Sequence, residues 1–282
     1  MALGEHSYGK SGVRLVAVTR TPGRHELRDL TVNVELHGSF HGAYVGGDNA
    51  GLLATDTMRN VVYALARERG VDEPETFGRD LVEHFLATGP TVTRARVELA
   101  EHPWARLEAD GAPHEHAFQR GHGGTRLATV SGDGERVEVE AGIDDLLVLK
   151  TTASGWEGFL RDPHTTLPET DDRVLATMVT ARWTYAGAVD YGETWRGVRD
   201  TLLEAFGDHH SPSVQFTLHR MGSAVLDRHP SVQRIHLSLP NRHHLLVDLA
   251  PFGLDNPNQV FQATTEPYGL IEGTIERDGE TR

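Results

Sequence analysis

Residues 4–11, Gly-Glu-His-Ser-Tyr-Gly-Lys-Ser, have the spacing of a phosphate-binding loop. In that chemistry, backbone N–H groups and the N-terminus of the following helix bind the phosphate, so a helix must follow the lysine. Residues 13–18, Val-Arg-Leu-Val-Ala-Val, are instead rich in β-branched residues and typical of a strand. We therefore reject nucleotide binding at this segment.

The second candidate site is the pair His114 and His116, which flank Glu115. Alternate residues of a strand share a face, so both rings would point the same way, as metal ligands must. No third ligand stands at a recognisable spacing, and the sequence contains no His-Glu-x-x-His motif. We expect hydrogen-bonded or solvated histidines there and no metal site. The sequence has no cysteine, which excludes disulfides, thiolate catalysis and iron–sulfur clusters.

Four further polar positions have side chains that can bind a ligand: Lys10, Arg173, Gln215 and the segment 241–243, Asn-Arg-His. Each also has a structural interpretation. Lys10 fits a solvated cation, Arg173 a surface ion pair, and Gln215 a capping residue in the first turn of a helix. The segment 241–243 fits a turn after Pro240. Taken one at a time, these structural interpretations are favoured.

The composition narrows the class of partner. The 282 residues include 27 Lys and Arg against 41 Asp and Glu, a formal net charge of −14, with no local basic patch. This charge argues against nucleic-acid binding. No apolar stretch reaches the length of a membrane span or of a signal-peptide core, so we expect a cytoplasmic protein with no membrane partner. The length predicts two domains, or one built from two similar halves.

The first half alternates between strand and helix patterns. Turn residues 21–24, Thr-Pro-Gly-Arg, predict a hairpin between the first two strands, and a glycine-rich loop is expected at 38–51. The expected elements are strands 13–18 and 30–36, helices 57–69 and 75–88, and strands 92–99, 105–109, 127–130 and 136–140.

The second half repeats this order, with Ser211 expected as the N-cap of a helix and Pro212 in its first position. Both halves therefore predict strand, strand, helix, helix, strand, strand, an α+β fold with antiparallel sheets. The apolar outer strands lack protective charges or prolines, so we expect the sheets to continue across subunits. The expected elements are strands 146–151 and 177–183, helices 194–206 and 212–229, and strands 232–239 and 244–249.

Short segments spread over nearly the whole chain, taken in their order and spacing, resemble the urate oxidase (uricase) family. The resemblance implies the tunnelling fold (T-fold), with two repeated antiparallel ββααββ-like halves, residues 8–141 and 142–278. It further implies a β-barrel that closes between subunits, with the helices outside, and a homotetramer. The matching segments are Tyr8-Gly9-Lys10, Ala54-Thr55-Asp56-Thr57, Pro113-His114-Glu115-His116-Ala117-Phe118, residues 149–162, Thr165-Thr166-Leu167, Arg173, Ser213-Val214-Gln215, residues 239–243 and Asn256-Pro257-Asn258.

The family oxidises urate with O2 to 5-hydroxyisourate and hydrogen peroxide, and it uses no metal and no organic cofactor. The resemblance therefore implies urate and O2 as the partners of this chain. It assigns the grip on the purine to Arg173 and Gln215. A guanidinium binds two rim acceptors at once, and a carboxamide offers one donor and one acceptor side by side. The backbone N–H of Val214, in the first turn of a helix, adds a donor for an anion.

The resemblance also assigns the remaining walls of the site. The purine stacks on Trp156, where the family usually has phenylalanine, and Phe159 fits a structural aromatic of the family. Leu167 lines the pocket. Asn241 holds O2, and later water, above the purine.

A proton relay is implied at Lys10, Thr55 and His243, with Thr55 and Asp56 supplied to the substrate by a neighbouring subunit. Urate must lose protons before it can pass electrons to O2, and a hydroxyl between an amine and an imidazole can move them. An isolated monomer is therefore expected to be inactive.

Two alternatives stay open at this point. One is another T-fold enzyme acting on purines or pterins, of the hydrolase or aldolase class, some of which hold zinc. The doubled length and the lack of a zinc triad argue against it. The other is a purine-binding protein that has lost catalysis, against which the presence of Lys10, Thr55 and His243 argues.

Overall fold

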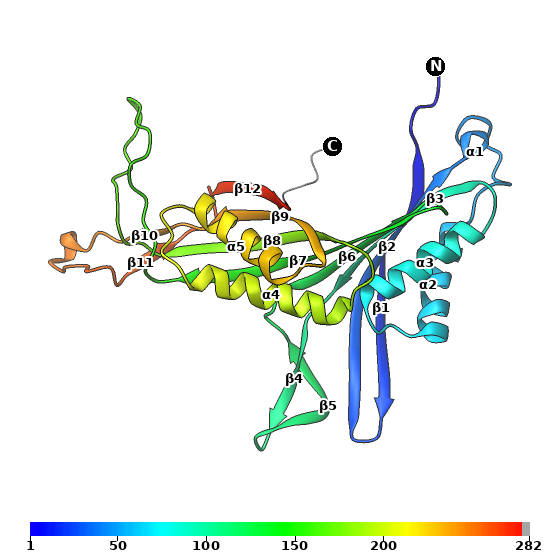
Figure 1. Ribbon diagram of the computed structural model, residues 1–282, viewed down its shortest axis with the longest axis horizontal. Helices are drawn as coiled ribbons and strands as arrows, with labels where there is room; N and C mark the ends of the chain where they lie inside the picture. Colours follow the sequence, from blue (N-terminus) through cyan, green and yellow to red (C-terminus); the bar gives the residue numbers. More distant parts are fainter. Residues whose placement is uncertain (278–282) are drawn as a thin grey trace. The chain divides into compact units, whose positions relative to one another are not determined.

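The computed structural model describes residues 1–277 and divides the chain into two compact units (Figure 1). The first unit is Met1–Gly142, and the second begins at Ile143. The sequence placed the boundary between residues 141 and 142, and its expected end of the second half, residue 278, lies outside the described residues. No described helix is long and apolar enough to cross a bilayer.

The first unit contains an antiparallel sheet with the strand order β1-β2-β3-β6. In β2, buried and more exposed residues alternate, because the apolar residues occupy every second position. The predicted hairpin is confirmed: β1 pairs with β2 through a turn in which Gly23 has a φ of 76°. The four strands are β1 (Ser7–Thr21), β2 (Arg24–Gly38), β3 (Val92–Glu101) and β6 (Thr125–Gly132).

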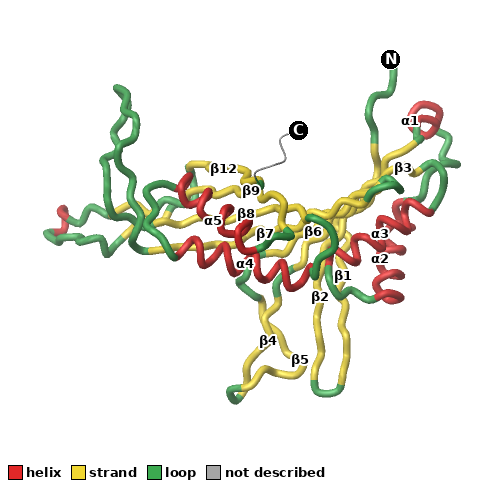
Figure 2. The backbone as a smooth tube through the Cα atoms, in the orientation of Figure 1, coloured by secondary structure: helices red, strands yellow, loops and turns green. Residues whose placement is uncertain are grey.

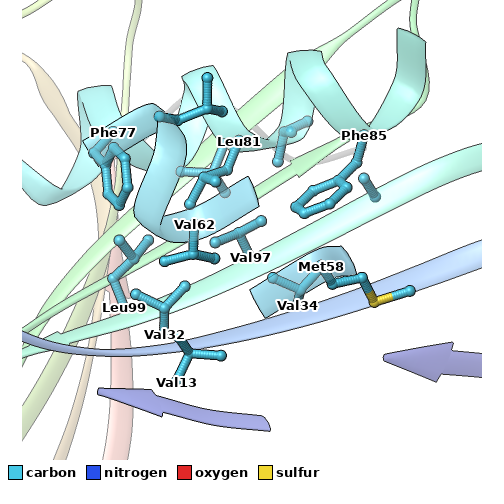
Figure 3. Packing of buried hydrophobic residues seen from close by; sticks show 14 of the residues in the cluster. Val13, Val32, Val34, Met58, Val62, Phe77, Leu81, Phe85, Val97 and Leu99 are labelled. Carbon is cyan, nitrogen blue, oxygen red and sulfur yellow. The ribbon is translucent and has the colours of Figure 1, made fainter. Parts of the chain in front are cut away.

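Two predicted helices, α2 (Thr55–Arg69) and α3 (Pro74–Ala87), cover one face of this sheet (Figure 2). Figure 3 shows their apolar side chains packed onto the valines and leucines of the strands. Gly78 lets α3 lie close to the sheet, because an added Cβ would stand 2.7 Å from a methyl group of Val130. Burying this apolar surface stabilises the unit by about 25 cal/mol per Å².

A buried cation lies at the start of α3. The side chain of Arg126, on β6, is 6% exposed, and its guanidinium lies 2.6 Å from Glu75 and 2.5 Å from Glu73. Glu101 is 3.9 Å away. Burial alone would lower the pKa of Arg126, but the three carboxylates outweigh it and raise the pKa above its ordinary value. The charge is therefore neutralised inside the protein.

Two features of the first unit differ from the sequence prediction. The expected glycine-rich loop contains a short helix, α1 (His41–Gly46). The strand β4 (Trp104–Ala109) was predicted, but its partner β5 (Ala112–Arg120) was not, because its Pro-His-Glu-His segment shows no apolar alternation. The two strands form a separate hairpin, turned by Asp110 and Gly111 with φ values of 54° and 76°.

The second unit contains the antiparallel strand order β8-β9-β12. Two helices, α4 (Tyr191–Gly207) and α5 (Val214–Arg228), pack on each other, and α5 also packs on β9 and β12. The predicted order of strand, two helices and strand is confirmed. The strands are β8 (Leu175–Tyr185), β9 (Val232–Asn241) and β12 (Gly269–Glu276).

The expected strands 136–140 and 146–151 are wrong as separate elements. They are one strand, β7 (Val137–Lys150), which contains the boundary between the units. Asp144 and Asp145 interrupt its apolar pattern. The Asp144 carboxylate accepts a hydrogen bond of 2.5 Å from the Thr180 hydroxyl, so a polar pair replaces an apolar one within the sheet.

The expected last strand, 244–249, is also wrong. Only β10 (His244–Leu246) forms there, paired with β11 (Phe261–Ala263) in a separate small sheet, and a 3-10 turn, η1 (Ala250–Phe252), follows. The sheet of the second unit ends instead in β12, whose glycines weaken the strand signal. Gly273 packs closely there, because an added Cβ would lie 3.0 Å from a methyl group of Leu218 on α5.

The start of α5 corrects a third expectation. The N-cap is Ser213, whose hydroxyl accepts the backbone N–H of Phe216 at 3.1 Å, and not Ser211. Pro212 therefore lies outside the helix. Gln215 still falls in the first helical turn.

Candidate active site

A cavity of about 420 Å³ opens in the second unit, a volume in the range of small-molecule sites. Three segments supply its walls: the chain between β7 and β8, the N-terminus of α5, and the end of β9 with the residues after it. The cavity brings together seven residues that the sequence singled out: Trp156, Leu167, Arg173, Val214, Gln215, Asn241 and His243.

Backbone pairing holds the chain between β7 and β8 in shape. Trp156 and Thr170 exchange N–H to C=O hydrogen bonds of 2.7 and 3.1 Å. The N–H of Arg173 donates to the carbonyl of Ser154 at 2.8 Å. Gly155 permits this close approach, because an added Cβ would stand 3.1 Å from the Thr170 carbonyl oxygen. Trp156 and Arg173 are thus fixed beside each other.

Arg173 is a cation without a counter-ion. Its Nε is fully buried and has no hydrogen-bond partner, and within residues 1–277 the side chain forms no salt bridge. Its guanidinium carbon lies 5.9 Å from the ring centroid of Trp156. Burial lowers the pKa of Arg173. The interpretation as a surface ion pair is wrong, and a buried donor left unpaired favours an anionic ligand in this cavity.

The N-terminus of α5 presents Val214 and Gln215 to the cavity. Because Ser213 already caps the helix, the carboxamide of Gln215 is not needed as a cap. Free backbone N–H groups and the helix dipole at this end favour negative charge. Arg173 and the start of α5 therefore offer donors to the same ligand.

The aromatic wall is a stack of two rings. The rings of Trp156 and Phe159 are nearly parallel, at 11° and 5.5 Å between centroids, and Arg161 lies 5.0 Å from the centroid of Phe159. Trp156 lines the cavity, whereas Phe159 does not. Phe159 thus supports the indole that a planar ligand would contact.

The end of β9 fixes the two polar residues of the remaining wall. Asn241 is paired with Thr177 of β8 on one side and with Gly269 of β12 on the other. The carbonyl of His243 accepts the backbone N–H of Thr264 at 2.9 Å. Asn241 and His243 therefore line the cavity from a well-anchored backbone.

Lys10, Thr55 and Asp56 lie in the first unit and do not line this cavity. The Tyr8 hydroxyl accepts the backbone N–H of Leu53 at 2.8 Å, and burial raises the pKa of Tyr8. This hydrogen bond fixes the start of α2 against β1, two residues from both Lys10 and Thr55.

Asp56 pairs with Arg59 at 2.7 Å on the exposed surface of α2. The structure thus separates the predicted site residues into two groups, one in each unit.

Sequence reasoning missed most of the apolar wall. Ile271, Val174 and Leu246 line the cavity. Ile271 lies on β12, which was not predicted, so no signal pointed to it. Val174 directly follows the singled-out Arg173, and Leu246 comes three residues after His243, so their apolar character close to these residues was the available signal.

The two histidines considered as metal ligands are joined by one hydrogen bond and by a ring contact. The Nδ1 of His114 accepts the backbone N–H of His116 at 3.2 Å, and their rings meet edge to face. Across residues 1–277, no three His, Asp or Glu side chains are placed to hold a metal ion.

The fold and the cavity define an α+β protein with a small-molecule-sized cavity that is lined by an aromatic ring and an unpaired cation. The family model "Uricase" matches residues 6–131 and 139–272. Uricase from Arthrobacter globiformis is 47% identical over 280 residues, which cover 99% of this chain and 91% of that protein. Uricase from Oryctolagus cuniculus is 40% identical over 283 residues, 98% of this chain and 94% of that one.

A crystal structure of the Arthrobacter globiformis uricase superimposes with a TM-score of 0.95 at 47% identity, covering 100% of this chain and 97% of that one. The chain belongs to the uricase family of urate-oxidising enzymes, and its fold is the T-fold.

Proposed function

We propose that this protein oxidises urate with O2 and water to 5-hydroxyisourate and hydrogen peroxide. Two electrons leave the purine and reduce O2 to peroxide, while water supplies the hydroxyl group at the oxidised carbon. In this proposal the electrons pass directly to O2, with no metal and no organic cofactor. The family assignment supports the activity, and the unpaired buried Nε of Arg173 is the observation that carries the substrate assignment.

Urate is a flat anion with acceptors and donors around its rim, and the cavity has a complementary group for each feature. Arg173 neutralises the charge and binds two acceptors, and Gln215 with the N–H of Val214 binds the opposite edge. Trp156 stacks on the ring, and Leu167 closes the apolar side. Asn241 holds O2 above the purine.

The proton relay of this proposal joins residues from two subunits. His243 is part of the cavity, whereas Lys10, Thr55 and Asp56 belong to the first unit and come from a neighbouring chain. Exposed apolar residues such as Leu245, Leu246 and Leu270 support burial against another subunit. We propose a homotetramer with its sites between subunits. The cytoplasmic location expected from the sequence stays a prediction.

The test is to add urate to the purified protein and to follow its ultraviolet absorbance, with peroxide detected in parallel and a chelator as the control. We expect urate loss with one peroxide per urate, unaffected by the chelator. Binding of a purine without peroxide would indicate a protein that has lost catalysis. Loss of activity with the chelator would refute the cofactor-free reaction.

A further inference from the structure

Three polar side chains near the start of α5, outside the lining of the cavity, are linked by hydrogen bonds that the proposed reaction does not use. Ser211 and Thr217 are both buried, with their hydroxyl oxygens 2.6 Å apart. The Nε2 of His209 lies 2.9 Å from the Thr217 oxygen, and its Nδ1 lies 2.8 Å from the carbonyl of Ala205 on α4. These hydrogen bonds run without a break from the end of α4 into the first turns of α5.

The hydrogen-bond partners show which atoms donate and which accept in this series of side chains. A carbonyl can only accept, so the Nδ1 of His209 donates to Ala205. Burial, together with the nearby Lys150 charge, lowers the pKa of His209, so its ring is neutral and Nε2 accepts from the Thr217 hydroxyl. The Ser211 hydroxyl therefore donates its one proton to the Thr217 oxygen, and the Ser213 carbonyl, at 3.1 Å, is its alternative acceptor.

Ser211 also connects to the aromatic side of the cavity through its backbone. Its carbonyl accepts the N–H of Gly155 at 2.8 Å, and its N–H donates to the carbonyl of Ala153 at 2.8 Å. The segment that it holds carries Trp156, and the next backbone pairing along it, Ser154 with Arg173, fixes the backbone of Arg173. One buried residue therefore joins the stacking wall, the cation and the start of α5.

We propose that Ser211, Thr217 and His209 form a positioning network that sets the spacing between the two substrate-binding sides of the purine site. One side consists of Trp156 and Arg173, and the other of Val214 and Gln215. This inference rests on the proposed function. None of the three lines the cavity, so they act through the residues that do. Loss of the Thr217 hydroxyl removes the partner of the His209 Nε2 and leaves the Ser211 hydroxyl with the Ser213 carbonyl alone. The link between the end of α4 and Ser211 is then broken, and the start of α5 and the Trp156 segment can move apart.

The test compares three variants as assembled protein. Thr217→Val removes the hydroxyl at nearly constant volume, and Thr217→Ser restores it. Thr201→Val is the matched control, because the buried Thr201 on α4 makes the same kind of bond, 3.0 Å to the Nε2 of His229 beyond the other end of α5. Ser211→Ala breaks the network from its other side and serves as the second variant should Thr217→Val fail to fold.

We measure the KM and kcat for urate and the Kd for 8-azaxanthine, an inert purine analogue, with unfolding followed in parallel. Thr217→Val should raise the KM and the Kd about tenfold, because the residues that bind the purine are no longer held at the right spacing. The kcat should change less than about threefold, because the groups that carry out the reaction are unchanged. Thr217→Ser should restore both values. Thr201→Val should lose similar stability without a change in KM or Kd.

Equal KM and Kd values for wild type and Thr217→Val, or an equal rise in Thr201→Val, would overturn the positioning network. Failure of the wild type to oxidise urate would instead overturn the proposed function, and the analogue's Kd would still test the network.

Discussion

The two units each enclose an arginine, and the surroundings of the two arginines are opposite. Arg126 in the first unit is surrounded by Glu73, Glu75 and Glu101, and these carboxylates raise its pKa. Arg173 in the second unit has an aromatic ring and, among residues 1–277, no paired carboxylate as its neighbour, and burial lowers its pKa. The first charge is satisfied by the fold. The second charge has no such partner, and this difference supports our proposal that Arg173 binds the substrate.

The largest change in a measured constant is expected from Lys10→Met. This variant tests whether the first unit contributes to the catalytic step and not to binding of the purine. Loss of the relay amine should lower kcat by about 10³- to 10⁴-fold, the upper range for a general acid or base. The Kd for 8-azaxanthine should stay within about threefold, because the grip on the purine lies in the second unit. Steady-state kinetics and an analogue titration measure both. Retained turnover would show that the relay assignment is wrong.

Arg126→Met should be a stability variant. Removing the cation leaves Glu75 buried without its partner, which costs about 3–5 kcal/mol in the free energy of unfolding. Urea unfolding at fixed protein concentration measures it, and the activity per folded molecule should not change. The double variant Arg126→Met with Glu75→Leu should recover much of the loss, because the buried charge is then gone. A stable single variant would contradict the internal pairing.

Arg173→Met should have the opposite effects to Arg126→Met: ligand binding should weaken while stability is kept. The Kd for the analogue should rise about 100-fold, equivalent to about 2.7 kcal/mol, because the charged donor that binds the purine anion is lost. The free energy of unfolding should hold or increase, since an unpaired buried cation has been removed. A variant that unfolds easily and still binds the analogue would place Arg173 among the structural arginines.

Trp156→Leu should have the smallest effect of the series. Loss of the aromatic face raises the KM for urate about tenfold, whereas Trp156→Phe, which keeps a ring, should change it less than about threefold. Phe159 supplies the support behind either ring. Equal KM values for all three proteins would remove Trp156 from the substrate contacts.

The sequence predicted those parts of the fold that depend on local pattern. The alternation in β2 and the helical spacing in α2 and α3 predicted these three elements, because their buried faces repeat at fixed intervals. β12 was missed because its two glycines weaken the local strand pattern, and one of them, Gly273, packs closely against Leu218, a tertiary contact that the local sequence does not reveal.

The same limit applies to the site. From the sequence alone, a surface ion pair was the favoured interpretation of Arg173, and only the structure shows that its Nε is buried without a partner. The resemblance to a family was needed to single this residue out. The hydrogen bonds of Ser211 could not be predicted, because its position in the sequence favoured a helix cap and its partners come together only in the folded chain.

The central claim is that one subunit supplies Lys10 and Thr55 to a purine held by Arg173 of another. Mixing Lys10→Met and Arg173→Met chains in equal amounts, by co-expression or joint refolding, tests it directly. Each variant alone should be nearly inactive. Random assembly should restore about a quarter of the wild-type activity, because a quarter of the sites then take an intact lysine from one chain and an intact arginine from another. Mixed tetramers as inactive as either parent would show that each site is built within a single chain.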